Sequence, residues 1–285
     1  MIKYNDIVLK TADALVKAST TFSPDKIEAY ERAFNIEENS NAKWVLETII
    51  ENSQVAKETK FPLCDDTGIP HIFLEIGDKA TLPGYFIRAI EEGVRTGLRQ
   101  LPGRPMAVKG NDRERISQIC GLSEDSGDLE MAPIQIREIK DSDKIALTVL
   151  MLGGGPEIRG KTLRVFHKHS DDVVINEMVD WAKEGCDKLG CLPAVLGFGI
   201  GRTNLEAASL SLEAMRQGNF LIQSDIEKEI TQKVNAAGYG PLGLGGKTTV
   251  LGTFVKVGPQ RASGVRIVSM RVGCCFDPRK WTVIL

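Results

Sequence analysis

The chain lacks a long apolar segment, an excess of charge of one sign and the apolar core of a signal peptide. No apolar run approaches the roughly 18–20 residues that a membrane-spanning helix needs, so we expect no membrane association. The formal net charge is −2 and no basic run occurs, which gives no electrostatic reason to expect binding to nucleic acid. Because the first 20 residues carry Asp6 and Asp13 instead of an apolar core, we expect a cytoplasmic protein at its mature start.

Cysteine is scarce, and its spacing excludes two common uses. Six cysteines in 285 residues are too few for a disulfide scaffold, and no Cys-x-x-Cys pair marks a zinc ribbon or a redox dithiol. We therefore expect reduced thiols, some of which can be metal ligands drawn from distant parts of the chain. The cysteines are Cys64, Cys120, Cys186, Cys191, Cys274 and Cys275.

Internal repeats and low-complexity linkers are also absent, which favours one continuous domain over residues 1–285, with a helical first part at residues 1–58. A hydrophobic content of 42% with 26% charged residues is typical of a soluble globular protein. Apolar residues at helical spacing predict a first helix capped by Asp6, a second that starts at Ser23-Pro24 and a third over about residues 40–57. The face of the third helix that we expect to be buried consists of Trp44, Val45, Thr48 and Ile49.

The rest of the chain alternates between strand and helix patterns, with residues 110–130 polar and expected to form a loop. The sequence therefore predicts an α+β fold, in which a helical N-terminal segment is followed by mixed sheets with packed helices. Strands are expected at about 71–76, 132–138, 144–152, 194–200, 249–257 and 264–272, and helices at about 84–99, 171–189, 204–216 and 225–237.

The stretch with the most chemistry is Phe-Pro-Leu-Cys-Asp-Asp-Thr-Gly-Ile-Pro at residues 61–70. Its two prolines limit regular pairing and Asp-Thr-Gly favours a turn, so Cys64 is expected on a rigid loop. A thiolate can bind a soft metal, and Asp66 could reach a substrate held at that metal. A solvated, Asp-rich turn with an incidental cysteine explains this stretch equally well.

Two further segments could contact a ligand. Arg104 lies in a turn bounded by prolines and could bind a carboxylate through its planar guanidinium, although arginines in such loops are more often solvated. Three glycines at 153–155 follow a predicted strand, where the backbone could approach a ligand closely or could form a flexible hairpin.

Two glycine-rich segments do not fit nucleotide-binding motifs. The glycines at 197, 199 and 201 have the wrong spacing for a dinucleotide motif, and they lie within a predicted strand. The Gly-Lys-Thr at 246–248 has Pro241 where a phosphate loop needs glycine, and a strand follows it instead of a helix.

Taken in order, several stretches between about residues 60 and 280 resemble the iron–sulfur-dependent hydro-lyases of the class I fumarase and tartrate dehydratase α-subunit type. Residues 64–68 resemble the family's Cys-Gln-Asp-Thr-Gly, residues 90–95 with Arg104-Pro105 its helix and Arg-Pro turn, and residues 153–157 its Gly-Gly-Gly-Ser-Glu. Residues 190–193 with 199–201 resemble Cys-Pro-Pro with Gly-Ile-Gly-Gly, residues 245–249 match Gly-Gly-Lys-Thr-Thr, and Cys274 is at the position of the third cluster cysteine.

The resemblance implies a 4Fe-4S cluster held by Cys64, Cys191 and Cys274, with one iron left without a protein ligand. Thiolates are the usual ligands of such clusters, and an open iron can act as a Lewis acid. This iron would bind a small 2-hydroxy-(di)carboxylate, and the implied reaction is its reversible dehydration, as in fumarate hydratase or tartrate dehydratase.

Four residues receive substrate roles from the same resemblance. Asp66 would transfer the hydroxyl proton, Arg104 would bind a substrate carboxylate, and the Gly155 backbone would contact substrate where a side chain would collide. Asp65 stands at a substrate-contact position. The base at carbon belongs to a second domain in this family, so a separate β-subunit that completes the active site is implied, in an oligomer.

The chain also departs from the family pattern. Asp65 replaces glutamine and so places a negative charge where a dianionic substrate would bind, and the histidine usually found before the third cysteine is missing. Other substrate-side positions differ, and Cys275 leaves the choice of the third ligand open. The differences are Pro156 for serine, Met106 for asparagine and Leu129 for asparagine.

These departures leave two other interpretations open. One is a non-catalytic iron–sulfur protein, serving as a redox sensor or binding protein on a diverged hydratase scaffold. In the other, the cysteines are inert core residues. Retention of Asp66, Arg104 and the triple glycine favours catalysis, because a sensor would not need them.

Overall fold

The computed structural model describes residues 2–285, which fold into two compact units. Unit 1 comprises the described residues of Met1–Thr21, Ser53–Leu152 and Arg279–Leu285. Unit 2 comprises Phe22–Asn52 and Gly153–Pro278. Each unit is therefore assembled from segments far apart in the sequence. Two such units can belong to one continuous domain, so the single domain expected over residues 1–285 stays a prediction.

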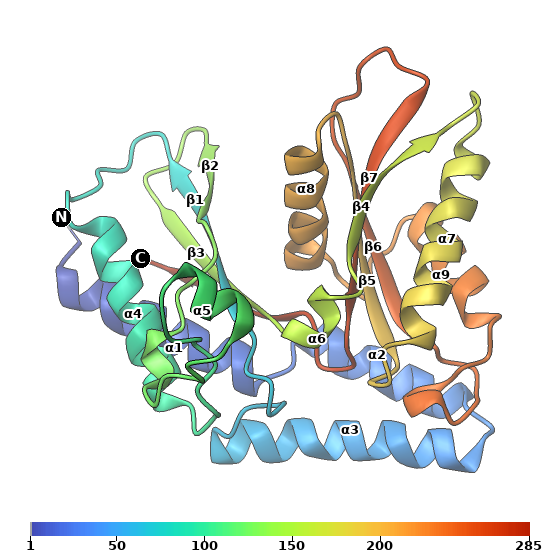
Figure 1. Cartoon of the computed structure of the whole chain (residues 1–285), viewed down its shortest axis with the longest axis horizontal. Helices are drawn as coiled ribbons and strands as arrows, with labels where there is room; N and C mark the ends of the chain where they lie inside the picture. Colours follow the sequence, from blue (N-terminus) through green and yellow to red (C-terminus); the bar gives the residue numbers. More distant parts are fainter. Residues whose placement is uncertain (1) are drawn as a thin grey trace. The chain divides into compact units, whose positions relative to one another are not determined.

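Unit 1 is built on a four-stranded sheet in the order β2-β1-β3-β8, in which β1 pairs with β2 in parallel and the other pairs are antiparallel. Helices α1 (Tyr4–Thr20) and α4 (Phe86–Gln100) lie side by side and share a core with the sheet (Figure 1). The buried Phe86, Ile90 and Val94 form the apolar face that the sequence predicted for α4. The strands are β1 (Ile69–Gly77), β2 (Gln135–Ile139), β3 (Ile145–Leu152) and β8 (Arg279–Ile284).

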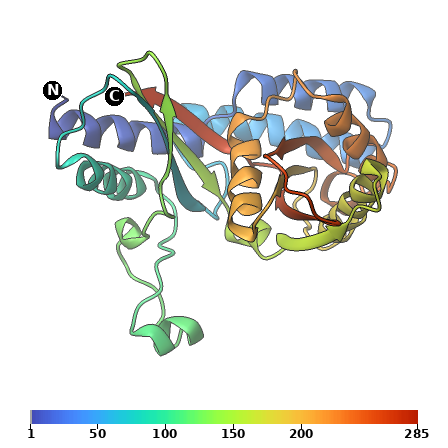
Figure 2. The ribbon, with the colours of Figure 1, turned by 90° about the horizontal axis from the view of Figure 1, so that it is seen from above.

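Between α4 and β2, residues 107–123 form an arm, which Figure 2 shows extending away from the helices and sheet of unit 1. It contains the short helix α5 (Asp112–Ser117), where the sequence predicted only a loop. That prediction was wrong because α5 buries none of its residues and so has no apolar periodicity. Its start is fixed by a capping box between Asn111 and Glu114. The 3₁₀ turn η1 (Ser126–Asp128) follows the arm.

Unit 2 is built on a sheet in the order β4-β7-β5-β6, in which β5 and β6 are parallel and the other pairs antiparallel. Helices α7 and α9 cover one face of this sheet and α8 covers the other (Figure 1). Gly199 of β5 lies against the backbone of Ala207 and Ser211 in α8, so the glycines of this strand allow close packing. The strands are β4 (Lys161–Phe166), β5 (Ala194–Gly201), β6 (Val250–Val257) and β7 (Val265–Gly273); the helices are α7 (Asp171–Asp187), α8 (Asn204–Gln217) and α9 (Asp225–Asn235).

Smaller elements complete unit 2. Helix α2 (Pro24–Ile36) starts at the predicted Ser23-Pro24 pair, and α3 (Ser40–Thr59) contributes its residues up to Asn52. The triple glycine, for which the sequence left a flexible hairpin open, instead leads into a single helical turn, α6 (Gly154–Glu157). A 3₁₀ turn, η2 (Pro241–Gly243), lies in the glycine-rich segment before β6.

The two mixed sheets with packed helices confirm the predicted α+β fold class. Two details of the predicted helices were wrong. Asp6 is not a cap, because α1 starts earlier, at Tyr4, and has Lys3 at its N-cap position. In α3, Val45 and Ile49 are buried but Trp44 is 63% exposed. Thr48 is exposed as well. Among the helices of residues 2–285, none combines the length and apolar character needed to cross a membrane.

Candidate active site

In unit 1, the loop that carries Cys64 is held from several sides. Leu63 is buried and its N–H donates to the carbonyl of Ser19 at 2.9 Å. The guanidinium of Arg279, on β8, is 1% exposed and donates to the carbonyls of Asp66 and Thr67 at 2.8 and 3.1 Å. Buried backbone carbonyls need such partners, so Arg279 fixes the path of the loop.

Gly68 ends this loop in a conformation that favours glycine. Its φ is +85°, and a Cβ at this position would lie 2.7 Å from the carbonyl oxygen of Leu152. The N–H of Gly68 donates to Oδ1 of Asp66 at 3.1 Å, so the Asp66 side chain closes a local turn. The half-buried Cys64 and Asp66 therefore occupy a loop of defined shape, as the proline and turn residues predicted.

The turn that carries Arg104 packs against the same loop. Gly103 lies next to the Thr67 side chain, and the Thr67 hydroxyl contacts the sulfur of Met106 at 3.7 Å. Nη1 of Arg104 forms an ion pair with Oδ2 of Asp65 at 3.4 Å, with both side chains exposed. The structure thus brings Arg104 to the loop that carries Cys64, Asp65 and Asp66.

In unit 2, the loops of Cys191 and Cys274 are joined by a hydrogen bond, from the N–H of Cys275 to the carbonyl of Cys191 at 3.0 Å. Two hydrogen bonds between Asp277 and Cys274 close the turn that carries Cys274. Its carboxylate accepts from the N–H of Cys274 at 3.1 Å, and its own N–H donates to the carbonyl of Cys274 at 3.0 Å. The structure therefore brings Cys191 and Cys274 to neighbouring loops.

The cysteine thiols differ in their surroundings. Partial burial, and then the charge of Cys274, raise the pKa of the Cys191 thiol, while Arg159 acts in the opposite direction. A hydrogen bond with the Cys274 thiol, together with burial, raises the pKa of Cys275. Burial alone raises the pKa of Cys186 to about 12, which makes it an inert core residue. Cys120 lies exposed on the arm.

Gly155, in α6, is also in unit 2. A Cβ built on it would meet no atom of the described residues within 4 Å, its two chain neighbours aside. The turn is anchored by an ion pair between Glu157 and Arg271, and by Arg159, which donates to the carbonyl of Gly155 at 2.8 Å and to that of Lys188 at 2.7 Å. Arg159 thus links the glycine turn to the end of α7, just before Cys191.

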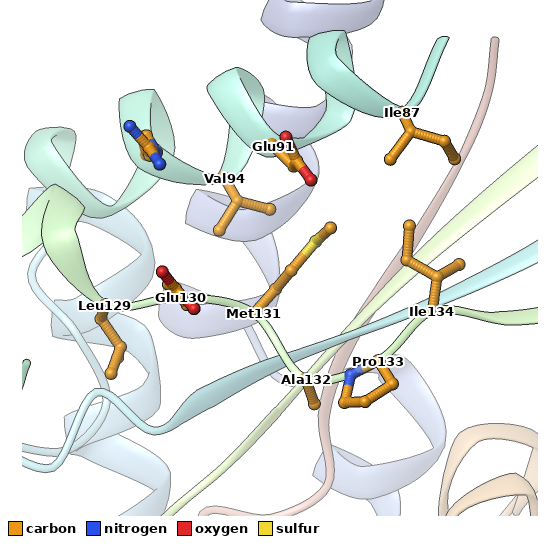
Figure 3. A pocket seen from close by; sticks show the side chains of 10 residues that line it. Ile87, Glu91, Val94, Leu129, Glu130, Met131, Ala132, Pro133 and Ile134 are labelled. Atoms are coloured by element: carbon orange, nitrogen blue, oxygen red, sulfur yellow. The ribbon is translucent and has the colours of Figure 1, made fainter. Parts of the chain in front are cut away.

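A surface hollow borders loops of the candidate site. In unit 2, an apolar hollow of about 270 Å³ borders Cys191 and Cys275 and is walled by α3 residues that include Trp44 and Ile49. In unit 1, a larger hollow of about 590 Å³ lies between α4 and residues 129–134, where Glu91 and Met131 point toward each other (Figure 3). No predicted site residue lines the larger hollow, so we do not assign the active site to it.

The surroundings of the three cysteine thiols are compatible with binding of an iron–sulfur cluster. None of the six cysteines forms a disulfide, and Cys64, Cys191 and Cys274 lie on loops that hydrogen bonds hold in place. Cysteine sulfurs are the donors that such clusters use, so these residue types fit the group. Within either unit, over residues 2–285, no three His, Cys, Asp or Glu side chains gather to hold a metal ion.

Comparison with known proteins identifies the family. Residues 8–283 match the family model described as fumarate hydratase (Fumerase). The chain belongs to the fumarate hydratase family. It is 30% identical over 287 residues, 97% of this chain and 94% of the relative, to a protein of Methanocaldococcus jannaschii that carries the provisional name L(+)-tartrate dehydratase subunit alpha.

A second relative supports the same assignment. The L(+)-tartrate dehydratase subunit alpha of Escherichia coli K12 is 24% identical over 290 residues, which cover 99% of this chain and 91% of the relative. These matches confirm the family that the motifs predicted and, with it, an enzyme of the hydro-lyase class.

Sequence analysis missed the residues that hold the site loops of this fumarate hydratase family member. Arg279, Lys26 and Tyr30 are all buried, yet each lies more than 200 residues away from the loop it contacts. No local pattern marks them, because each occupies an ordinary strand or helix position. Asp277 was within reach of prediction, because it lies three residues after Cys274 and directly before Pro278.

Proposed function

We propose that the chain is the α-subunit of an iron–sulfur-dependent hydro-lyase that reversibly dehydrates a small 2-hydroxy-(di)carboxylate, of the fumarate hydratase or tartrate dehydratase type. Family membership supports the reaction class. The observation that supports the assignment of the site is the packing of the Arg104 turn against the loop of Cys64, Asp65 and Asp66 in unit 1.

Cys64, Cys191 and Cys274 would hold a 4Fe-4S cluster. When bound, the cluster supplies a Lewis-acidic iron without a protein ligand, at which the hydroxyl and a carboxylate of the substrate can bind. The hydrogen bonds that fix the Cys191 and Cys274 loops support this ligand set, because ligands that are already positioned lose less entropy on binding.

The chain's own residues then act on the substrate. Asp66 exchanges a proton with the substrate hydroxyl, and the Gly68 N–H bond to its Oδ1 orients the carboxylate for that transfer. Arg104 binds a substrate carboxylate through two parallel N–H groups, after the substrate displaces Asp65. The Gly155 backbone would contact the substrate, in a space where a Cβ would meet no atom of the described residues within 4 Å, its chain neighbours aside.

A separate β-subunit completes the site in this proposal. Both relatives are named as alpha subunits, and the chain covers 91–94% of their length. The base at carbon is expected on that partner, in an oligomer that works in the cytoplasm, where thiols stay reduced.

The test is an iron and sulfide determination on protein purified without oxygen, where we expect brown protein with about four irons per chain. Cys64→Ser, Cys191→Ser and Cys274→Ser should each abolish the cluster. The matched controls are Cys120→Ser on the exposed arm and Cys186→Ser in the core, which should keep the colour. A colourless wild-type protein would refute the proposal and favour inert core cysteines.

One observation favours the alternative of a non-catalytic iron–sulfur sensor or binding protein. Asp65 already occupies Arg104, the group that would bind a substrate carboxylate. A panel of hydroxy acids assayed with both subunits separates the two functions, because a sensor would retain the cluster and turn over none of them.

A further inference from the structure

Lys26 is a lysine in an unusual place. It is 1% exposed, and it lies in the first turn of α2, where the positive end of the helix dipole disfavours a cation. Burial of an ammonium group costs free energy unless other groups compensate it. The groups packed around Lys26 must therefore compensate for its charge.

The contacts of Lys26 lead to the Cys274 loop. Its Nζ donates to the carbonyl of Asp277 at 2.7 Å and lies 4.2 Å from the ring centroid of Phe22. The carboxylate of that same Asp277 accepts the N–H of Cys274. Lys26 therefore contacts Asp277, the residue that closes the turn of the predicted cluster ligand Cys274.

Tyr30 contacts the same loop from the next turn of α2. It is fully buried, and its hydroxyl donates to the carbonyl of Cys275 at 2.5 Å. Its ring stacks on Phe22 with centroids 5.7 Å apart. Because residues four apart share one face of a helix, Lys26 and Tyr30 act together on residues 274–277. The N–H of Cys275 in turn donates to the carbonyl of Cys191, so the same contacts also hold the loop of a second predicted ligand.

The charge of Lys26 also suits its place. A cluster held by thiolates is rich in negative charge, and a fixed cation nearby favours the more reduced, more negative state. Removal of residues that orient metal ligands through hydrogen bonds typically lowers metal affinity by roughly 10- to 100-fold.

We infer that Lys26, supported by Tyr30, is a positioning residue for the iron–sulfur cluster: it holds the Cys274 loop, and its positive charge raises the reduction potential and the retention of the cluster. The inference rests on the proposed function, since it requires Cys274 to be a cluster ligand.

The experiment uses full-length Lys26→Met, Tyr30→Phe and wild-type protein, each loaded anaerobically with iron and sulfide. Three properties are measured: iron per chain, the midpoint potential by a redox titration of the visible absorption, and the rate of cluster loss to a chelator. For Lys26→Met we expect a more negative potential and cluster loss roughly 10- to 100-fold faster. Tyr30→Phe keeps the charge, so it should accelerate loss with little change in potential.

Lys43→Met is the matched control, because Lys43 also lies over an aromatic ring in unit 2, at 4.6 Å from the centroid of Phe34. It should behave as the wild type does. An unchanged potential in Lys26→Met would overturn the inference, since a purely structural tether would alter stability alone. If Lys26→Met does not fold, Tyr30→Phe decides, and wild-type retention in that variant would overturn the inference. A wild-type protein that takes up no iron would instead refute the proposed function.

Discussion

At the scale of single residues, the candidate active site contains an internal competition. Asp65 and Arg104 form an exposed ion pair beside the Cys64 loop, and Arg104 is the group expected to bind a substrate carboxylate. Exposed pairs of this kind contribute about 0–1 kcal/mol. A substrate carboxylate can therefore displace Asp65, although it binds less tightly than it would to an unpaired arginine.

Asp65→Gln should lower KM for the hydroxy-carboxylate substrate by about two- to fivefold, the range that matches an exposed ion pair, and leave kcat unchanged. Steady-state kinetics of the complete enzyme measures this. Asp112→Asn removes a similar exposed aspartate–arginine pair on the arm and serves as the control. An unchanged KM in Asp65→Gln would show that Asp65 does not oppose substrate binding.

Asp66→Asn should keep the cluster and lower turnover by roughly 10²- to 10⁴-fold, because an amide cannot exchange the hydroxyl proton. The amide oxygen can still accept the N–H of Gly68, so the loop should keep its shape. Iron content and turnover are measured on the same sample. Turnover at the wild-type rate would refute the acid–base role of Asp66.

At the scale of elements, the Cys64 loop depends on a strand from the far end of the chain. β8 contributes Arg279, whose buried guanidinium binds two loop carbonyls. The loop is thus shaped by its own turn chemistry and by long-range contacts, of which Arg279 comes from furthest along the chain. Loss of that contact would leave backbone carbonyls buried without their partner.

Arg279→Met should lower the free energy of unfolding by about 2–4 kcal/mol, because charged hydrogen bonds to buried carbonyls are lost. Chemical denaturation of the cluster-free protein measures this. Lys280→Met changes the next residue on β8, which points to the opposite face of the strand, and should cost far less. Equal effects of the two substitutions would contradict a specific role for Arg279.

At the scale of the whole molecule, neither unit is a continuous stretch of sequence. Unit 1 is closed by residues 279–285, and unit 2 takes in residues 22–52. The cysteines proposed as cluster ligands, Cys64, Cys191 and Cys274, are likewise far apart in the sequence.

The isolated chain should bind the cluster but show no turnover, because the base at carbon is expected on the β-subunit. Addition of that subunit should restore dehydration, and size-exclusion chromatography should show a complex. An unrelated protein added at the same concentration is the control. Turnover by the isolated chain would place all catalytic groups on it and contradict the need for a partner.

The sequence by itself determined the features that depend on near neighbours in the chain. The buried face of α4, the start of α2 at Ser23-Pro24 and the defined turn at Asp66 and Gly68 were all predictable. Each follows from periodicity or turn chemistry within a few residues. The ordered motifs also identified the family, because catalytic residue types recur at fixed places.

Only the tertiary structure decided which distant residues meet. Arg279 lies 213 positions from Asp66, and Lys26 lies 251 positions from Asp277. Such contacts leave no mark on local spacing, so a buried lysine reads in the sequence as an ordinary exposed helix residue. The pairing of Asp65 with Arg104 was hidden for the same reason, since it arises from the packing of Gly103 and Met106 against Thr67.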